Sequence, residues 1–73
     1  MTAHELRKEI KALQEIVDSL WAVSDRLKEE IKADPDTKLK KTAEILNNHE
    51  HIQGIDHQIY YLKQELKAIT EEQ

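Results

Sequence analysis

Apolar residues recur at alternating intervals of four and three residues along both halves of the chain. The series in the first half contains Leu6, Ile10, Leu13, Val17, Leu20, Leu27 and Ile31. The series in the second half contains Ile45, Ile52, Ile55, Ile59, Leu62, Leu66 and Ile69. This spacing places each series on one stripe of an α-helix, at the a and d positions of a heptad repeat, whereas a half-buried strand needs strict alternation. The chain is therefore predicted to be all-α, with two long amphipathic helices.

A single proline separates the two series. Pro35 disfavours helical geometry at Asp34 and cannot donate a backbone hydrogen bond, so the first helix is expected to end near Ala33. Asp34 and Pro35 are also suited to the N-cap and first position of the next helix. We predict one domain over residues 1–73, with helices at about 3–33 and 36–71 and a turn at about 34–36. A turn this short favours an antiparallel hairpin; the alternative is one long helix kinked at Pro35.

Gly54 is a second possible interruption, and a break there would give a three-helix bundle. The heptad phase runs unbroken from Ile45 to Ile69, however, so one helix is expected to continue through Gly54. A glycine inside a helix costs about 1 kcal/mol relative to alanine. It could be explained by the close approach of Trp21 or of a partner helix.

Composition limits how such a hairpin can be stabilised. With 73 residues and no cysteine, the chain can bury only a small core and cannot use disulfides or thiolate metal sites. Oligomerisation is the remaining common solution. Charged residues make up 36% of the chain and its net charge is −4, which argues against non-specific nucleic-acid binding. Residues 1–8 resemble neither a signal peptide nor a membrane span, so a cytoplasmic location without membrane contact is expected.

The apolar surface is wider than one seam requires. On the first helix Ile16 and Val23 lie at position g, beside the seam, and on the second Leu46 and Tyr60 lie at position b. A second chain is expected to cover these residues together with their neighbours. The predicted interface residues are Ile16, Trp21, Val23, Leu46, His49, Gln53 and Tyr60. The simplest assembly is a homodimeric four-helix bundle with two-fold symmetry; the alternative is one subunit of a hetero-oligomeric coiled-coil complex.

Two polar residues interrupt the apolar series, Ser24 in the first helix and Asn48 in the second. With a turn centred on Asp34 and Pro35, Asn48 is expected opposite Leu20 and Trp21, and Ser24 near Ile45. Each could bond locally to its own helix, to a carbonyl or to water. Alternatively, a buried Asn48 could fix register and oligomeric state.

Three histidines lie close together in the second half, at positions 49, 51 and 57. Helical ligand pairs need a separation of three or four residues to reach one metal ion, and none of these pairs has it. His49 and His57 are therefore weak metal candidates, and only across a dimer. Within a dimer interface, protonation of these histidines at mildly acidic pH could loosen the assembly.

No catalytic or cofactor-binding motif is present, so the protein is expected to be non-enzymatic and to need no cofactor. We predict a small regulatory or scaffolding module that binds its own copy and a partner protein. The alternative is a nucleic-acid-binding helical dimer that uses a basic end near the turn. That end would contain Lys28, Lys32, Lys38, Lys40 and Lys41. No aromatic residue alternates with these lysines to stack on bases.

Overall fold

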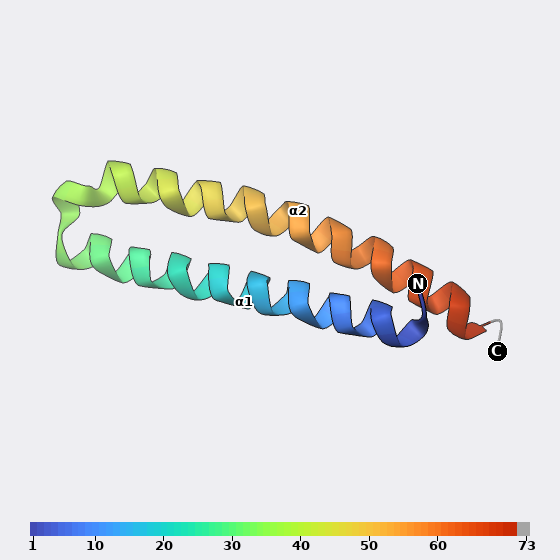
Figure 1. Ribbon diagram of the computed structural model, residues 1–73. Coiled ribbons are helices and arrows are strands. Elements are labelled where there is room, and N and C mark those ends of the chain that lie inside the picture. The colour runs from blue at the N-terminus through green and yellow to red at the C-terminus, as the bar shows by residue number, and fades with distance from the viewer. Residues whose placement is uncertain (72–73) are drawn as a thin grey trace.

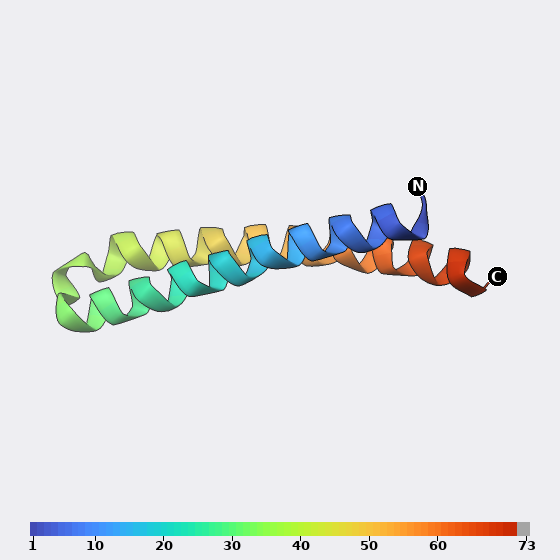
Figure 2. The same ribbon diagram turned by 60° about the horizontal axis from the view of Figure 1, so that its bottom comes forward.

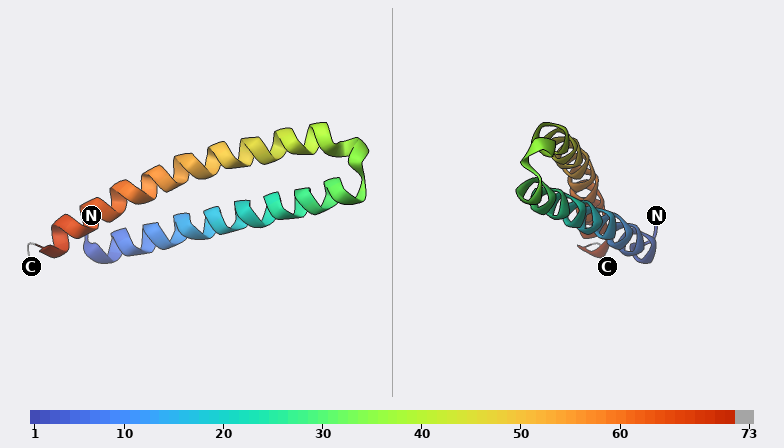
Figure 3. Two further views of the ribbon diagram at one scale, coloured as in Figure 1. Left: turned by 180° about the vertical axis from the view of Figure 1, so that it is seen from behind. Right: turned by 90° about the vertical axis from the view of Figure 1, so that its left-hand side faces the viewer.

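The computed structural model describes residues 1–71, which form two long helices joined by a short turn (Figure 1). Helix α1 spans Ala3–Ala33, the 3₁₀ helix η1 spans Pro35–Thr37, and α2 spans Lys38–Glu71. The helices are antiparallel and lie side by side in a single layer (Figures 1 and 3). The predicted all-α hairpin is therefore confirmed, and a single helix kinked at Pro35 is excluded.

The shape is that of a rod. Its Cα atoms extend over 57 × 15 × 14 Å, with a radius of gyration of 16.6 Å. A compact domain of this length has a radius of gyration of about 11 Å. The helices cross in projection in Figure 2, as expected when two helices wind around a shared apolar seam.

Local side-chain bonds explain where each helix begins and ends. Thr2 and Glu5 form a capping box, in which the Glu5 backbone N–H donates to Thr2 Oγ1 at 3.1 Å and the Thr2 N–H donates to Glu5 Oε1 at 3.4 Å. At the turn, the Asp36 N–H donates to the Asp34 carboxylate at 3.3 Å, and the Thr37 hydroxyl donates to the Asp34 carbonyl at 2.8 Å. These bonds organise η1, so α2 begins at Lys38 rather than at about residue 36.

The core is one thin seam. Its buried apolar residues are Leu6, Val17, Leu27, Ile45, Ile52, Ile55 and Ile59. All of them belong to the two heptad series, as predicted, and Ser24 is buried with them. No second layer covers this seam within residues 1–71. Within the same residues, neither helix has a stretch apolar enough to cross a membrane.

The register of the seam differs from the expected one by about one helical turn. Asn48 lies opposite Ser24, to which its Nδ2 donates a hydrogen bond at 3.4 Å, and not opposite Leu20 and Trp21. Trp21 instead contacts His49, with ring centroids 5.1 Å apart. Nearer the turn, Lys41 Nζ lies 3.3 Å from Glu30 Oε2. The extra residues of η1 account for the shift, because they move the start of α2 further along the chain.

Gly54 does not interrupt α2, which is continuous from Lys38 to Glu71. An added Cβ at Gly54 would meet no other atom within 4 Å. Trp21 therefore does not pack against this glycine, contrary to one of the explanations suggested by the sequence. The space beside Gly54 is open on the outside of the hairpin.

Candidate interaction surface

The hairpin is a layer of two helices, and the layer has two broad sides. The contact between Trp21 and His49 joins the e positions of the two helices and so marks one side of the seam. We define side A by positions e and b of both helices, and side B by positions g and c. Positions e and b lie next to each other on a helix, and g and c lie together across the seam from them.

The predicted interface residues do not form one surface, because they are divided between these two sides. Trp21, Leu46, His49, Gln53 and Tyr60 belong to side A. Ile16 and Val23 belong to side B, so no single neighbour that packs on one side can cover all seven. The seven residues therefore remain predicted interface residues, five on side A and two on side B. The antiparallel register, rather than the apolar spacing alone, decides which flanking residues share a side.

Side A carries large apolar side chains that the hairpin itself leaves open. Trp21 is 43% exposed, Leu46 58%, Tyr60 57% and Leu39, near the turn, 89%. The Trp21 indole is tilted by 49° against the His49 imidazole. His49 Nε2 is buried there and has no hydrogen-bond partner among residues 1–71. Side A is thus anchored at its centre by a ring contact and surrounded by exposed apolar groups.

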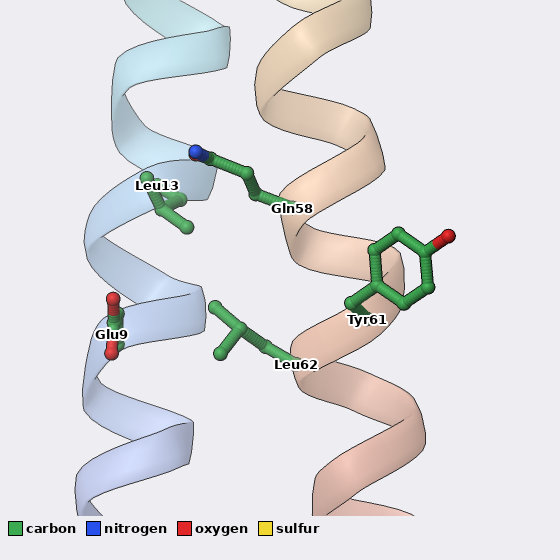
Figure 4. Close-up of a pocket in the computed structure, with 5 residues that line it drawn as sticks. All are labelled: Glu9, Leu13, Gln58, Tyr61 and Leu62. Carbon is green, nitrogen blue, oxygen red and sulfur yellow. The ribbon is translucent and has the colours of Figure 1, made fainter.

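Side B is smoother. Ile16 is 45% exposed, Val23 is partly buried, and Gly54 leaves a gap in the surface of α2. Toward the chain termini a shallow groove of about 310 Å³ is lined by Glu9, Leu13, Gln58, Tyr61 and Leu62 (Figure 4). In Figure 4, Gln58 and Leu62 reach from α2 toward α1, whereas the Tyr61 ring points outward. Tyr61, which is 61% exposed, is an aromatic surface residue that the sequence reasoning did not select.

The histidines are held in separate environments. His49 contacts Trp21 on side A, whereas the ring of His57 meets Tyr61 edge-on, at a centroid distance of 4.9 Å. His51 lies at position g, on side B. In the part of the chain that the structure describes, no three His, Cys, Asp or Glu side chains are grouped so that they could hold a metal ion. The hairpin alone therefore does not bring His49 and His57 together.

The lysines near the turn are also dispersed. Lys32 Nζ lies 3.2 Å from Glu29 Oε1, and Lys41 is paired with Glu30. The heptad positions place Lys28 and Lys32 on side A and Lys40 on side B. Lys38 and Lys41 occupy seam positions. The five residues proposed as a basic end therefore do not share one surface.

A different charged region forms at the open end of the hairpin, where the N-terminus lies beside the last turns of α2 (Figure 1). Two heptads from the Trp21 and His49 contact, the facing e positions are Arg7 and Lys63. On side B the facing g positions near the same end are Glu9 and Glu65. The sequence reasoning missed both pairs because their members are more than fifty residues apart in the chain. They become neighbours only once the register is known.

The exposed area is large for a chain of this mass. The surface measures 5608 Å², whereas a compact monomer of 8.6 kDa exposes about 4,700 Å². The excess of about 900 Å² resembles the roughly 800 Å² that each partner contributes to an ordinary protein–protein interface. The elongated shape of the hairpin leads to this extra exposed area.

Comparison with known proteins adds no functional assignment. The sequence matches no protein-family model, and neither a curated protein nor a solved structure is significantly similar to the chain.

Proposed function

We propose that this chain is a non-enzymatic interaction module that works by helix-on-helix contacts. A second copy of the hairpin covers the exposed apolar side chains of the first, and the two hairpins form a four-helix unit. This unit scaffolds or regulates a partner protein through its remaining helix surfaces. The observation that carries the proposal is the exposure of Trp21, Leu46 and Tyr60 on one side of a hairpin whose core is a single seam.

The energetic argument starts from the size of that seam. Small domains with one thin core are only marginally stable, and burial against another chain is a common remedy. Covering the exposed half of a side chain such as Leu46 or Tyr60 contributes roughly 1 kcal/mol or more. Soluble monomers rarely leave several such groups together on one surface. Self-association therefore both shields side A and stabilises the helices.

The chemistry of the surface supports binding rather than catalysis. The groove on side B is lined by two leucines, a tyrosine, a glutamine and a glutamate. Its carboxylate, Glu9, has no histidine, cysteine or serine beside it in that lining with which it could share a proton. The groove is suited to receiving an apolar side chain of another protein.

The test is to place charges on side A without disturbing the seam. We expect the wild type to have at least twice the mass of one chain by sedimentation equilibrium. The variant Leu46→Glu, Tyr60→Glu should keep its helical circular dichroism but sediment as a single hairpin. A matched control is Ala43→Glu, Gln64→Glu, which adds the same charge at exposed position f on the outer edge of α2. The control should associate like the wild type.

Two results would contradict the proposal. The first is a wild type that remains monomeric at high concentration, and the second is a side A variant that associates as strongly as the edge control.

The binding of a partner protein is tested with the same proteins immobilised as bait. A protein retained by the wild type and by the edge control, but not by the side A variant, is the expected result. Equal retention by all three would show that side A does not contribute to partner binding.

A further inference from the structure

The two sides of the hairpin carry opposite charge at the open end. Side A has Arg7 and Lys63 at facing e positions, with Lys11 and Lys67 following them at positions b. Arg7 and Lys11 on α1, and Lys63 and Lys67 on α2, are like-charged pairs whose members are four residues apart. Among residues 1–71, Lys67 Nζ has one nearby carboxylate, Glu71 Oε1 at 4.0 Å, and both side chains are 67% exposed. An ion pair this open contributes little, so the open end of side A remains basic.

Side B is acidic at the same end. Glu9 and Glu65 occupy facing g positions, and Glu5, at position c, lies one helical turn before Glu9. The described ion pairs of side B lie near the turn, where Glu30 contacts both Arg26, at 3.7 Å, and Lys41. Basic and acidic clusters are thus separated only by the thickness of the two-helix layer.

These facing pairs do not favour a solitary hairpin. Antiparallel helices are normally stabilised when opposite charges flank the seam, whereas like charges there repel. Arg7 with Lys63, and Glu9 with Glu65, are both like-charged pairs. Each pair becomes favourable when a surface of opposite charge covers it. The surface with the required charge at the required place is the other side of a second copy.

Shape agrees with charge along the middle of the layer. Side A projects Trp21, Leu46 and Tyr60, which are all about half exposed. Side B offers the exposed flank of Ile16 and the gap beside Gly54, which lies between Leu46 and Tyr60 along α2. Large side chains of one copy can therefore approach the backbone of α2 in the next copy. This close approach would explain why a glycine stands at position 54.

We propose that side A of one hairpin packs on side B of a second copy, with both open ends pointing the same way. The proposal rests on the self-association proposed above and specifies its geometry. Packing A on A would place the basic open end against the basic open end or against Lys28 and Lys32. Packing A on B in opposite directions would place it against the turn end. There Glu30 and Glu44 are outnumbered by Arg26, Lys40 and Lys41, and Arg26 and Lys41 contact Glu30.

This arrangement differs from the two-fold dimer expected from the sequence. An A-on-B contact joins different surfaces, so each pair of hairpins keeps one free side A and one free side B. The dimer is the first product, and further copies add in the same manner as concentration rises. A partner protein that imitates either side can end the stack. The free sides are therefore where the four-helix unit meets its partner.

The test uses two variants that each disable one side. Arg7→Glu, Lys63→Glu reverses side A, and Glu9→Lys, Glu65→Lys reverses side B. Each exchange replaces one like-charged facing pair by another, so the hairpin itself should be little affected, and circular dichroism checks this. Glu5 is left unchanged because it belongs to the capping box. Glu15→Lys, Glu50→Lys is the matched control for the side B variant, with the same charge change at exposed f positions on the two outer edges.

We expect each reversed variant alone to sediment as one chain at a concentration where the wild type and the edge control associate. Mixing the two variants in equal amounts should restore association, because the intact basic side A of one variant meets the intact acidic side B of the other, and the two reversed sides are likewise opposite in charge. Raising the salt concentration should weaken association of the wild type, since exposed charges are screened over about 8–10 Å at 0.1–0.15 M salt.

Direction is tested with spin labels on Gln64→Cys in both members of the mixed pair. The chain has no native cysteine, so the labels are unique. Packing in the same direction brings the labelled edges side by side, whereas packing in opposite directions separates them by roughly 30 Å along the helices. The larger separation would overturn the proposed direction.

Other outcomes separate this inference from the proposed function. If the side B variant alone still associates and the mixture gains nothing, the contact is A on A, and the inference fails while self-association stands. If the wild type is monomeric, self-association itself fails. A single-stranded oligonucleotide could instead bind monomeric wild type and the Glu15→Lys, Glu50→Lys control but not the Arg7→Glu, Lys63→Glu variant. In that case the basic open end binds nucleic acid and this inference is wrong.

Discussion

Asn48 of α2 donates a hydrogen bond from its Nδ2 to the hydroxyl of Ser24 on α1, across the middle of the seam, at 3.4 Å. Ser24 is completely buried and Asn48 partly so. Every other residue of the heptad series near this pair is apolar. The two polar residues therefore satisfy each other, and they do so in only one register of the hairpin.

Removal of both partners should cost less than the sum of the two single removals. We expect Asn48→Ala to lower the free energy of unfolding by about 1–2 kcal/mol, because the Ser24 hydroxyl is left without its partner. In a double-mutant cycle with Ser24→Ala, the two effects should fail to add by about 0.5–1 kcal/mol. Urea unfolding at one fixed protein concentration measures all four proteins. Simple additivity would show that the pair makes no energetic contact.

Two leucines at opposite extremes of exposure test the single-seam core. Leu6 is completely buried, and Leu6→Ala should lower stability by about 2–4 kcal/mol through lost burial and an unfilled cavity. Leu39 is 89% exposed, so Leu39→Ala should leave the unfolding of dilute protein nearly unchanged. Thermal unfolding followed by circular dichroism compares them. Equal losses in the two variants would mean that Leu39 is buried in the folded protein.

The seam shows what the sequence could and could not predict. The apolar spacing predicted both helices, and Pro35 predicted the position of the break, because both signals are local. The predicted register was wrong because the a and d positions of two helices face each other equally well after one helix is moved by three or four residues along the other. The hydrogen bonds of Asp34 and Thr37 in the turn, together with the Ser24 and Asn48 pair in the seam, determine which match is realised. An error of one turn was therefore built into any estimate from spacing alone.

The candidate surface follows the same logic. Trp21, Leu46 and Tyr60 were identified from their residue type and heptad position, and all three are exposed. Ile16 and Val23 were selected because they widen the apolar face on the other side of the seam. The charged pairs at the open end could not be recognised before α1 and α2 were aligned.

Gly54→Ala should have opposite effects on folding and on association. No atom lies within 4 Å of the added Cβ, and alanine is the better helix former, so the dilute hairpin should gain about 0.5–1 kcal/mol. If a second copy packs on side B beside Gly54, the same methyl group should weaken association. Urea unfolding at low concentration and sedimentation at high concentration measure the two effects. Association as strong as that of the wild type would place the contact elsewhere.

Trp21 is the only tryptophan in the chain, so its fluorescence reports directly on side A. The indole is 43% exposed in the single hairpin. We expect its emission to shift to shorter wavelength as concentration rises, because a second copy removes water from the ring. The shift should be absent in the Leu46→Glu, Tyr60→Glu variant. Emission that does not depend on concentration, in a protein shown to associate, would exclude side A from the contact.

The rod shape has a practical consequence in solution. A molecule that measures 57 Å along one axis and 15 Å or less across the others experiences more friction than a sphere of equal mass. A single hairpin should therefore elute early from a gel-filtration column and resemble a larger globular protein. Early elution is thus expected even of one chain, and only light scattering or equilibrium sedimentation can distinguish one hairpin from two.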